Sequence, residues 1–306
     1  MSPVAHQPQQ LARANGIDIC YEIFGDATAE PMLLIMGLGA QMVLWDDAFC
    51  EKLAERGFRV IRFDNRDIGQ SSKMSGGKRL TAFELLKLRL LKIPVAAPYR
   101  LYDMAVDTIA LMDVLGIRKA HLVGASMGGM IAQEIAITFP ERVRSLTSIM
   151  STTGNPKVPP PSREAAAMLM APPPKTREEY IARFQATWKL LRVGSFPEDE
   201  VLDALRAERC YSRGLNPAGV GRQFRAILAS GSRKARLAQV TAPTLVIHGS
   251  VDPLVRPEGG KDTAASISGA KLLMIEGMGH ALPIPMWPQV IDAIAMHAKG
   301  AAAKAA

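Results

Sequence analysis

The sequence has little cysteine, no long apolar run and no spacing typical of metal ligands. Its three cysteines, Cys20, Cys50 and Cys210, are odd in number and far apart, which argues against a disulfide framework and against a zinc site. No apolar run approaches the roughly 18 residues that cross a bilayer, so we expect no stable membrane insertion. Residues 1–16 lack the apolar stretch of a secretory signal, and we expect a loose N-terminal arm on a cytoplasmic protein.

Acidic residues are fewer than basic ones, 29 Asp and Glu against 37 Lys and Arg, which gives a net charge of +8. The basic residues are spread along the chain without a nucleic-acid-binding motif, so we expect no nucleic-acid partner. The densest basic stretch, residues 78–92, has leucines at helical spacing. Such an amphipathic helix either lies on a membrane surface or presents one solvated face, and the sequence leaves this choice and the oligomeric state open.

Apolar residues make up 48% of the chain, which is ample for a large core, and short β-rich runs alternate with helical patterns. Strands are predicted at residues 16–25, 31–37, 58–64, 119–125, 144–150, 243–249 and 271–277, and helices at 46–57, 102–116, 127–143 and 287–300. Several of these strands are apolar on both faces, as in the centre of a parallel sheet. The alternation predicts an α/β fold with a mostly parallel, doubly wound sheet.

The alternation stops at residues 152–240, where a proline-rich stretch leads into helical patterns only. These patterns lie near residues 177–192, 198–210 and 216–230. We therefore predict a core formed by 1–151 and 241–306, with an all-helical lid over 152–240 inserted before the penultimate strand. Such a lid would cover the carboxyl edge of the sheet, where open α/β sheets bind ligands.

Ser126 lies between two glycines at the point where a predicted strand meets a predicted helix, in the sequence GASMG. Gly124 and Gly128 let the strand and the helix approach closely. A tight turn of this kind strains the backbone of the serine and exposes its Oγ at the top of the sheet. The G-x-S-x-G pattern in this context predicts a nucleophile rather than a simple helix N-cap.

A serine nucleophile needs a base, and the base needs an orienting carboxylate. His280 follows the last predicted strand in a glycine-containing loop, which places it at the carboxyl edge of the sheet. Asp252 follows the preceding strand at the same edge, whereas Asp262 falls in a helical stretch. We therefore predict a triad of Ser126, Asp252 and His280, in the chain order typical of this architecture.

The oxyanion of acyl transfer needs two amide donors. Met127 should supply one, because its N–H belongs to the first turn of the helix after the serine. The other should be the amide of Leu38, in a turn where Gly37 and Gly39 let the backbone bend inward. Side chains and amides then fill every role, so we predict no metal and no organic cofactor.

The sequence resembles the α/β-hydrolase superfamily over about 16–150 and 240–300. The segments that carry the resemblance are, in order, LLIMGLGA, VIRFDNRDIGQSS, AHLVGASMGGMIAQ, PTLVIHGSVDPLV and IEGMGHALP. The branch they resemble is a carboxylesterase group that includes aclacinomycin methylesterase. Many members have histidine at the position of Met36, and this departure leaves the backbone amide donor untouched. The resemblance implies a serine esterase with a helical lid and a small-molecule ester substrate.

We accordingly predict a serine carboxylesterase that hydrolyses small to medium esters through an acyl-enzyme. A lactonase, a carbon–carbon bond hydrolase or a perhydrolase could use the same triad, and a non-catalytic hydrolase-fold receptor is a further alternative. Trp45, Met168, Met170 and Trp188 are candidate pocket residues, with ordinary packing as the alternative for each. In DNRDIGQSS, residues 64–72, we expect Asp64, Arg66 and Asp67 to form a structural polar network.

Overall fold

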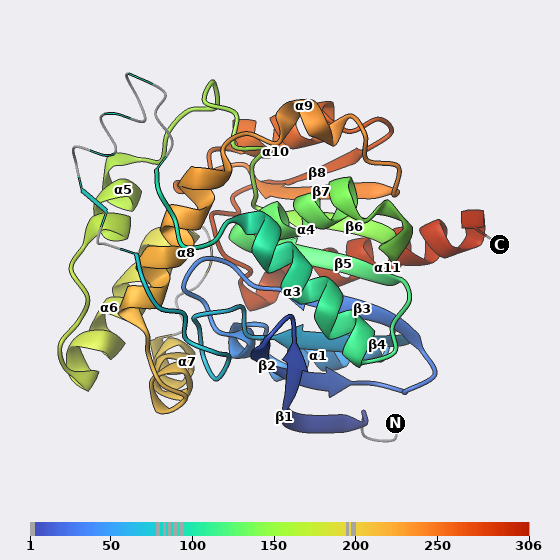
Figure 1. Ribbon diagram of the computed structural model, residues 1–306, viewed down its shortest axis with the longest axis horizontal. Coiled ribbons are helices and arrows are strands. Elements are labelled where there is room, and N and C mark those ends of the chain that lie inside the picture. Colours follow the sequence, from blue (N-terminus) through green and yellow to red (C-terminus); the bar gives the residue numbers. More distant parts are fainter. Residues whose placement is uncertain are drawn as a thin grey trace.

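The computed structural model describes residues 4–305, apart from 78–79, 82–83, 85–86, 88–90, 92–94, 194–195 and 197–199. An eight-stranded sheet with the order β1-β2-β4-β3-β5-β6-β7-β8 runs through the molecule (Figure 1). Its strands are β1 (His6–Ala14), β2 (Ile17–Phe24), β3 (Glu30–Ile35), β4 (Phe58–Phe63), β5 (Ala120–Ala125), β6 (Val143–Ile149), β7 (Thr244–Gly249) and β8 (Lys271–Ile275). β2 is antiparallel to both of its neighbours, and the other pairs are parallel. The predicted α/β class and mostly parallel sheet are confirmed.

The expectation of a loose N-terminal arm is wrong. His6–Ala14 forms β1, which pairs with β2, and the His6 ring stacks on Phe24 with 4.2 Å between ring centroids. Of its nine residues only Ala12 and Ala14 are buried, because β1 is the edge strand of the sheet. Because both faces of this edge strand are largely solvated, its residues do not alternate between apolar and polar. No hydrophobic pattern therefore predicts a strand here.

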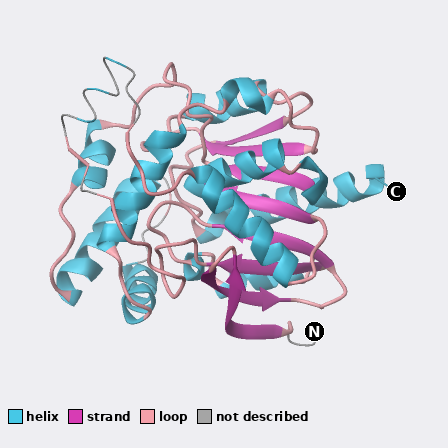
Figure 2. Ribbon diagram, viewed as in Figure 1, coloured by secondary structure: helices cyan, strands magenta, loops and turns pink. Residues whose placement is uncertain are grey.

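Helices cover both faces of the sheet (Figure 2). α3 (Leu101–Val114) and α4 (Met127–Thr138) pack on one face, and α1 (Asp47–Ala54) and α11 (Trp287–Ala305) pack on the other. The other elements are α10 (Pro257–Ala265), which contacts β7 and β8, and the short 3₁₀ helices η1 (Met42–Leu44), η2 (Pro140–Arg142) and η3 (Ile284–Met286). Along β3, Leu33 and Ile35 join the α3/α4 core whereas Met32 and Leu34 join the α1/α11 core. This two-sided burial explains why the strand is apolar throughout.

The chain between β6 and β7 forms helices and loops, with no strand among its described residues. Its helices are α5 (Arg163–Met170), α6 (Arg177–Arg192), α7 (Glu200–Ser212), α8 (Pro217–Ser230) and α9 (Lys234–Leu237). Three starts follow from the local sequence, because the side chains of Ser162, Thr176 and Asn216 accept hydrogen bonds from first-turn amides. α5 to α8 gather beyond one end of the sheet, at the left of Figure 1. The exact lid limits, 152 and 240, stay a prediction.

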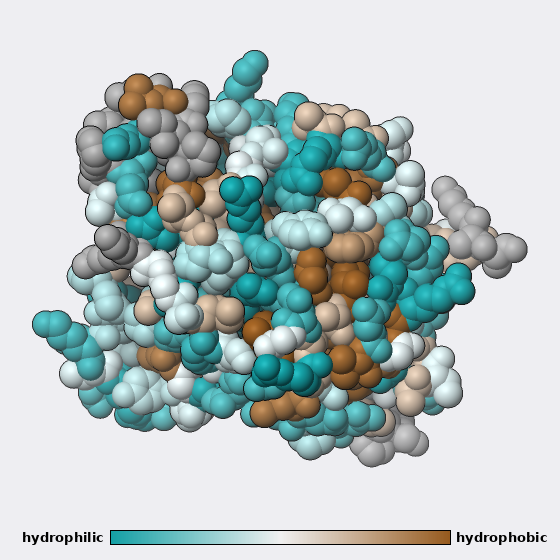
Figure 3. Space-filling model, in the orientation of Figure 1, coloured by the Kyte–Doolittle hydropathy of each residue, from teal (hydrophilic) through white to brown (hydrophobic). Residues whose placement is uncertain are grey.

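Hydrophilic side chains predominate on the face shown in Figure 3, and apolar side chains form separate patches among them. In the described part of the chain, every helix is too short or too polar to cross a bilayer. The amphipathic helix predicted at 78–92 lies mostly outside the described residues.

Candidate active site

Ser126 occupies a strained turn between β5 and α4. Its backbone has φ 55° and ψ −118°, and such a positive φ costs free energy in a residue with a side chain. Hydrogen bonds hold the turn, since the Ser126 amide donates to the Ile149 carbonyl (2.9 Å) and Ser151 Oγ donates to the Ser126 carbonyl (2.8 Å). The strain is therefore maintained by the neighbouring strand β6, and Ser126 lies on the wall of a cavity.

The two elbow glycines are required by close backbone contacts. A Cβ atom on Gly124 would lie 2.2 Å from the carbonyl oxygen of Gly128. A Cβ atom on Gly128 would lie 2.0 Å from the carbonyl oxygen of Ile35, at the end of β3. Both distances are far below any normal contact, so α4 can meet the sheet in this way only with glycine at these positions.

Asp252 and His280, which the sequence places 28 residues apart, form a hydrogen bond. Asp252 is fully buried in the loop after β7, and its Oδ1 accepts from the amides of Leu254 and Val255 at 2.8 Å each. Its Oδ2 lies 2.7 Å from His280 Nδ1. With Nδ1 donating to the carboxylate, the second ring nitrogen of His280 is left as the basic atom. His280 lines the same cavity as Ser126.

His248 is a buried neighbour of this pair that the predicted triad did not include. Its Nε2 lies 2.8 Å from the Val255 carbonyl and 3.5 Å from Asp252 Oδ2, and its Nδ1 has no partner among the described residues. Burial lowers the pKa of His248, so the ring is neutral at neutral pH. The only local signal was its position at the end of a strand leading to the predicted acid.

The turn after β3 lies directly against Ser126. A Cβ atom on Gly37 would be 3.2 Å from Ser126 Cβ and 3.7 Å from its Oγ. Within the described part of the chain, the amide of Leu38 has no acceptor, and Leu38 lines the cavity. Met127 is the first residue of α4, where helix geometry leaves the N–H free. The two predicted oxyanion donors thus stand in segments that meet at the serine.

The cavity has a volume of about 1030 Å³ and lies between the sheet edge and the lid helices. Its wall includes all four residues predicted to line a pocket: Trp45, Met168, Met170 and Trp188. Trp45 also packs in the core: the residue is 2% exposed, and its ring centroid lies 5.4 Å from that of Phe49.

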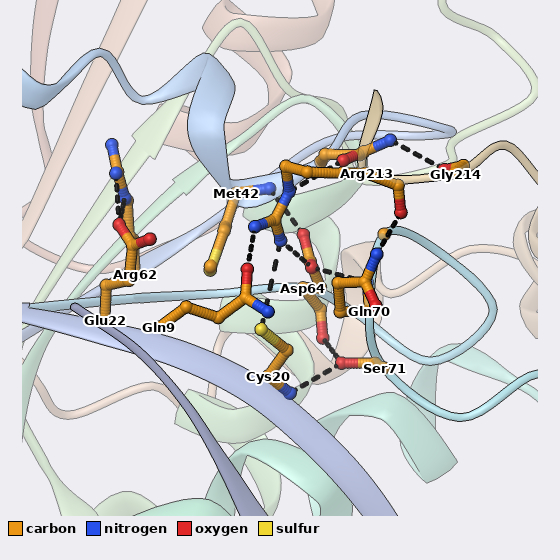
Figure 4. Close-up of polar contacts among 12 residues, drawn as sticks. Gln9, Cys20, Glu22, Met42, Arg62, Asp64, Gln70, Ser71, Arg213 and Gly214 are labelled. Atoms are coloured by element: carbon orange, nitrogen blue, oxygen red, sulfur yellow. Dashed lines mark hydrogen bonds and ion pairs between the residues drawn. The ribbon is translucent and has the colours of Figure 1, made fainter. Parts of the chain in front are cut away.

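The segment after β4 forms the polar network expected of it, and the network ties the core to the lid. Asp64 accepts from the Met42 amide (2.7 Å) and the Gln70 amide (2.9 Å), and it pairs with Arg213, which follows α7 (Figure 4). Figure 4 also shows Arg213 close to Cys20 on β2. A lid residue is therefore anchored to the edge of the sheet.

Asp67 and Arg66 extend this network in two directions. Asp67 pairs with Arg222 of α8 at 2.7 Å, whereas Arg66 pairs with Asp107 of α3 at 2.5 Å. Burial alone would raise the pKa of Asp67, but hydrogen bonds from Arg222 and Tyr99 outweigh burial and the pKa lies below its ordinary value. Asp67 is therefore a buried anion whose charge is matched by the lid.

Comparison with known proteins agrees with this architecture. The family described as alpha/beta hydrolase fold matches residues 30–285. Rhodomycin D methylesterase DauP from Streptomyces sp. strain C5 is 32% identical, over 96% of this chain and 99% of that protein. The meta-cleavage product hydrolase from Pseudomonas fluorescens IP01 has a TM-score of 0.76 at 21% identity, over 95% of this chain and 98% of that one. The enol-lactonase from Burkholderia xenovorans LB400 has a TM-score of 0.72 at 20% identity, over 94% and 99%. These structural likenesses show the fold, and the family match along most of the chain shows that this protein belongs to the α/β-hydrolase family.

Proposed function

We propose that the protein is a serine carboxylesterase that hydrolyses small to medium esters through an acyl-enzyme intermediate. The observation that carries the proposal is the 2.7 Å hydrogen bond between His280 and buried Asp252, on a cavity whose wall also holds the strained Ser126. A neutral imidazole oriented by a carboxylate is the arrangement that turns a serine hydroxyl into a nucleophile. The similarity to a methylesterase along nearly the whole chain supports ester bonds as the substrate class.

In the proposed reaction, Ser126 Oγ attacks the ester carbonyl while His280 Nε2 takes the hydroxyl proton. Asp252 keeps its charge and stabilises the imidazolium that forms. The negative oxygen of the tetrahedral intermediate accepts hydrogen bonds from the amides of Leu38 and Met127. His280 then protonates the departing alcohol, and a water that it activates releases the acid from Ser126.

The cavity wall bears on the choice of ester. Met168 and Met170 of α5 and Trp188 of α6 offer an apolar lid surface, and thioether side chains adapt to different shapes. A cavity of about 1030 Å³ is large enough for a drug-sized molecule. Methyl esters of bulky apolar acids, together with a series of p-nitrophenyl esters of increasing acyl length, are therefore the first substrates to test.

The direct experiment combines labelling with substitution. A fluorophosphonate should label Ser126 stoichiometrically, and Ser126→Ala should lower kcat for p-nitrophenyl acetate by roughly 10³-fold or more. Ser212→Ala, which removes an exposed hydroxyl at the end of α7, is the matched control and should keep full activity. Labelling of another residue, or turnover by Ser126→Ala close to that of the native protein, would contradict the proposal.

The same panel separates the competing functions. Hydrolysis of lactones or of vinylogous diketones in preference to every ester would assign the triad to lactonase or carbon–carbon bond chemistry. Tight binding of an ester without turnover and without labelling would indicate a receptor that kept the fold and lost the reaction.

A further inference from the structure

One lid side chain reaches across to the turn that carries Leu38. Gln223 of α8 is fully buried, and its Oε1 accepts a hydrogen bond from the Gly39 amide at 2.9 Å. Its Nε2 donates to the Arg66 carbonyl at 2.9 Å. Both ends of the carboxamide are therefore used to join two core turns, one after β3 and one after β4, although 184 residues separate Gln223 from Gly39 in the sequence.

The turn after β3 is held from its other side as well. Asn65 Nδ2 donates to the Met36 carbonyl at 2.9 Å. Gly39 has φ 68°, a conformation that favours glycine, and a Cβ atom there would lie 3.2 Å from both γ-carbons of Val220 on α8. Leu38 therefore lies between a residue whose carbonyl is fixed by Asn65 and a residue whose amide is fixed by Gln223.

Fixing these two groups restricts the directions that the Leu38 N–H can take. The peptide plane between Leu38 and Gly39 is held by Gln223, and only the two soft dihedrals of Leu38 separate it from the plane that contains the Leu38 N–H. An oxyanion donor is effective when it points at the developing charge before reaction begins. The lid helix thus contacts the very turn whose orientation matters most for acyl transfer.

We propose that Gln223 is a positioning residue for the oxyanion hole, so that lid helix α8 forms part of the catalytic apparatus as well as a wall of the pocket. This inference rests on the proposed esterase function. α8 has independent anchors, because Arg222 pairs with Asp67 and Asn216 Nδ2 donates to the Asp67 carbonyl at 2.9 Å. Loss of the Gln223 carboxamide should therefore free the turn while the helix stays in place.

Gln223→Met removes both hydrogen bonds with little change in side-chain volume. We expect kcat for p-nitrophenyl acetate to fall by about 10- to 100-fold with KM changed less than about twofold, because the amide is misdirected and the binding surface is kept. The inhibition constant of a trifluoromethyl ketone, which forms a tetrahedral adduct with a serine nucleophile, should rise in parallel with the loss in kcat/KM.

Gln133→Met is the matched control. Gln133 is also fully buried, and it binds Arg233 and Ser148 rather than the oxyanion turn. This variant should lose thermal stability to a similar degree, with kcat and ketone affinity close to native values. Equal losses of kcat in the two variants, or unchanged ketone affinity in Gln223→Met, would overturn the inference.

Gln223→Glu supplies a second test that does not depend on the methionine variant folding. A protonated carboxyl can make both hydrogen bonds of the carboxamide, whereas an ionised one turns an oxygen toward the Arg66 carbonyl oxygen and is repelled from the position that accepts from Gly39. The ratio of the Gln223→Glu kcat to the native kcat at the same pH should therefore rise as the pH falls from about 8 to about 6. A ratio that does not change with pH would count against the inference. If the native protein itself neither turns over esters nor binds the ketone, the proposed function fails. Normal native activity together with indifference to Gln223 defeats only the positioning role.

Discussion

Replacement of Gly128 by alanine is a stringent test of the active-site geometry. The added Cβ would lie 2.0 Å from the Ile35 carbonyl oxygen and 2.9 Å from that of Met36. These atoms are backbone at the end of β3 and cannot rotate away. Because real Cβ contacts are almost never shorter than 3.0 Å, α4 and the end of β3 must separate by about 1 Å.

The size of the effect follows from what this movement displaces. Gly128 is next to Met127, and the end of β3 leads into the turn of Leu38, so the two proposed oxyanion donors would move apart. A misplacement of about 1 Å in catalytic geometry costs on the order of 100-fold in rate, and overpacking of a core contact costs about 1–3 kcal/mol of unfolding free energy. Gly128→Ala should therefore lose both activity and stability.

The assay compares kcat for p-nitrophenyl acetate with urea unfolding monitored by circular dichroism. Gly300→Ala is the control, because a Cβ atom on this exposed glycine of α11 meets nothing within 4 Å. Because alanine favours the helix more than glycine does, Gly300→Ala should raise the unfolding free energy by about 0.5–1 kcal/mol and leave activity unchanged. A Gly128→Ala protein with kcat within threefold of native and an unchanged unfolding midpoint would refute the close approach of α4 to β3.

Two predictions concern ionisable groups outside the proposed triad. Burial lowers the pKa of His121 and His248 below the usual 6.5, so the unfolded chain binds more protons, and the melting temperature should fall as the pH drops from about 7.5 to about 5.5; a flat or rising melting temperature would contradict this. Burial is also the main reason why the thiol pKa values of Cys20, Cys50 and Cys210 rise to about 11, 12 and 12. Iodoacetamide at pH 8 should consequently modify them only after unfolding, and rapid labelling of the native protein would show that a thiol is accessible.

Much of the framework was determined by local sequence. β3 is apolar throughout because both of its faces are covered, and this requirement is visible in the residues themselves. Glycine is required on both sides of Ser126, because a Cβ atom on Gly124 or Gly128 would lie 2.2 Å or 2.0 Å from a backbone carbonyl oxygen. The proximity of Asp252 and His280 could be inferred because the carboxyl ends of parallel strands share one edge of the sheet.

The remaining features were decided by tertiary packing. The polar residues of β1 join the sheet through backbone pairing with β2, and no side-chain pattern predicts this pairing. Gln223 meets Gly39, and Arg213 meets Asp64, only because the lid settles on the core, and hydrogen bonds between residues so distant in the chain leave no local periodicity to detect. The sequence by itself specified the seven strands β2 to β8 and the turns that follow them, since those depend on neighbours a few residues away. The folded chain alone decided which groups of the helical insertion contact the turn that carries Leu38, since that depends on how two parts far apart in the sequence pack together.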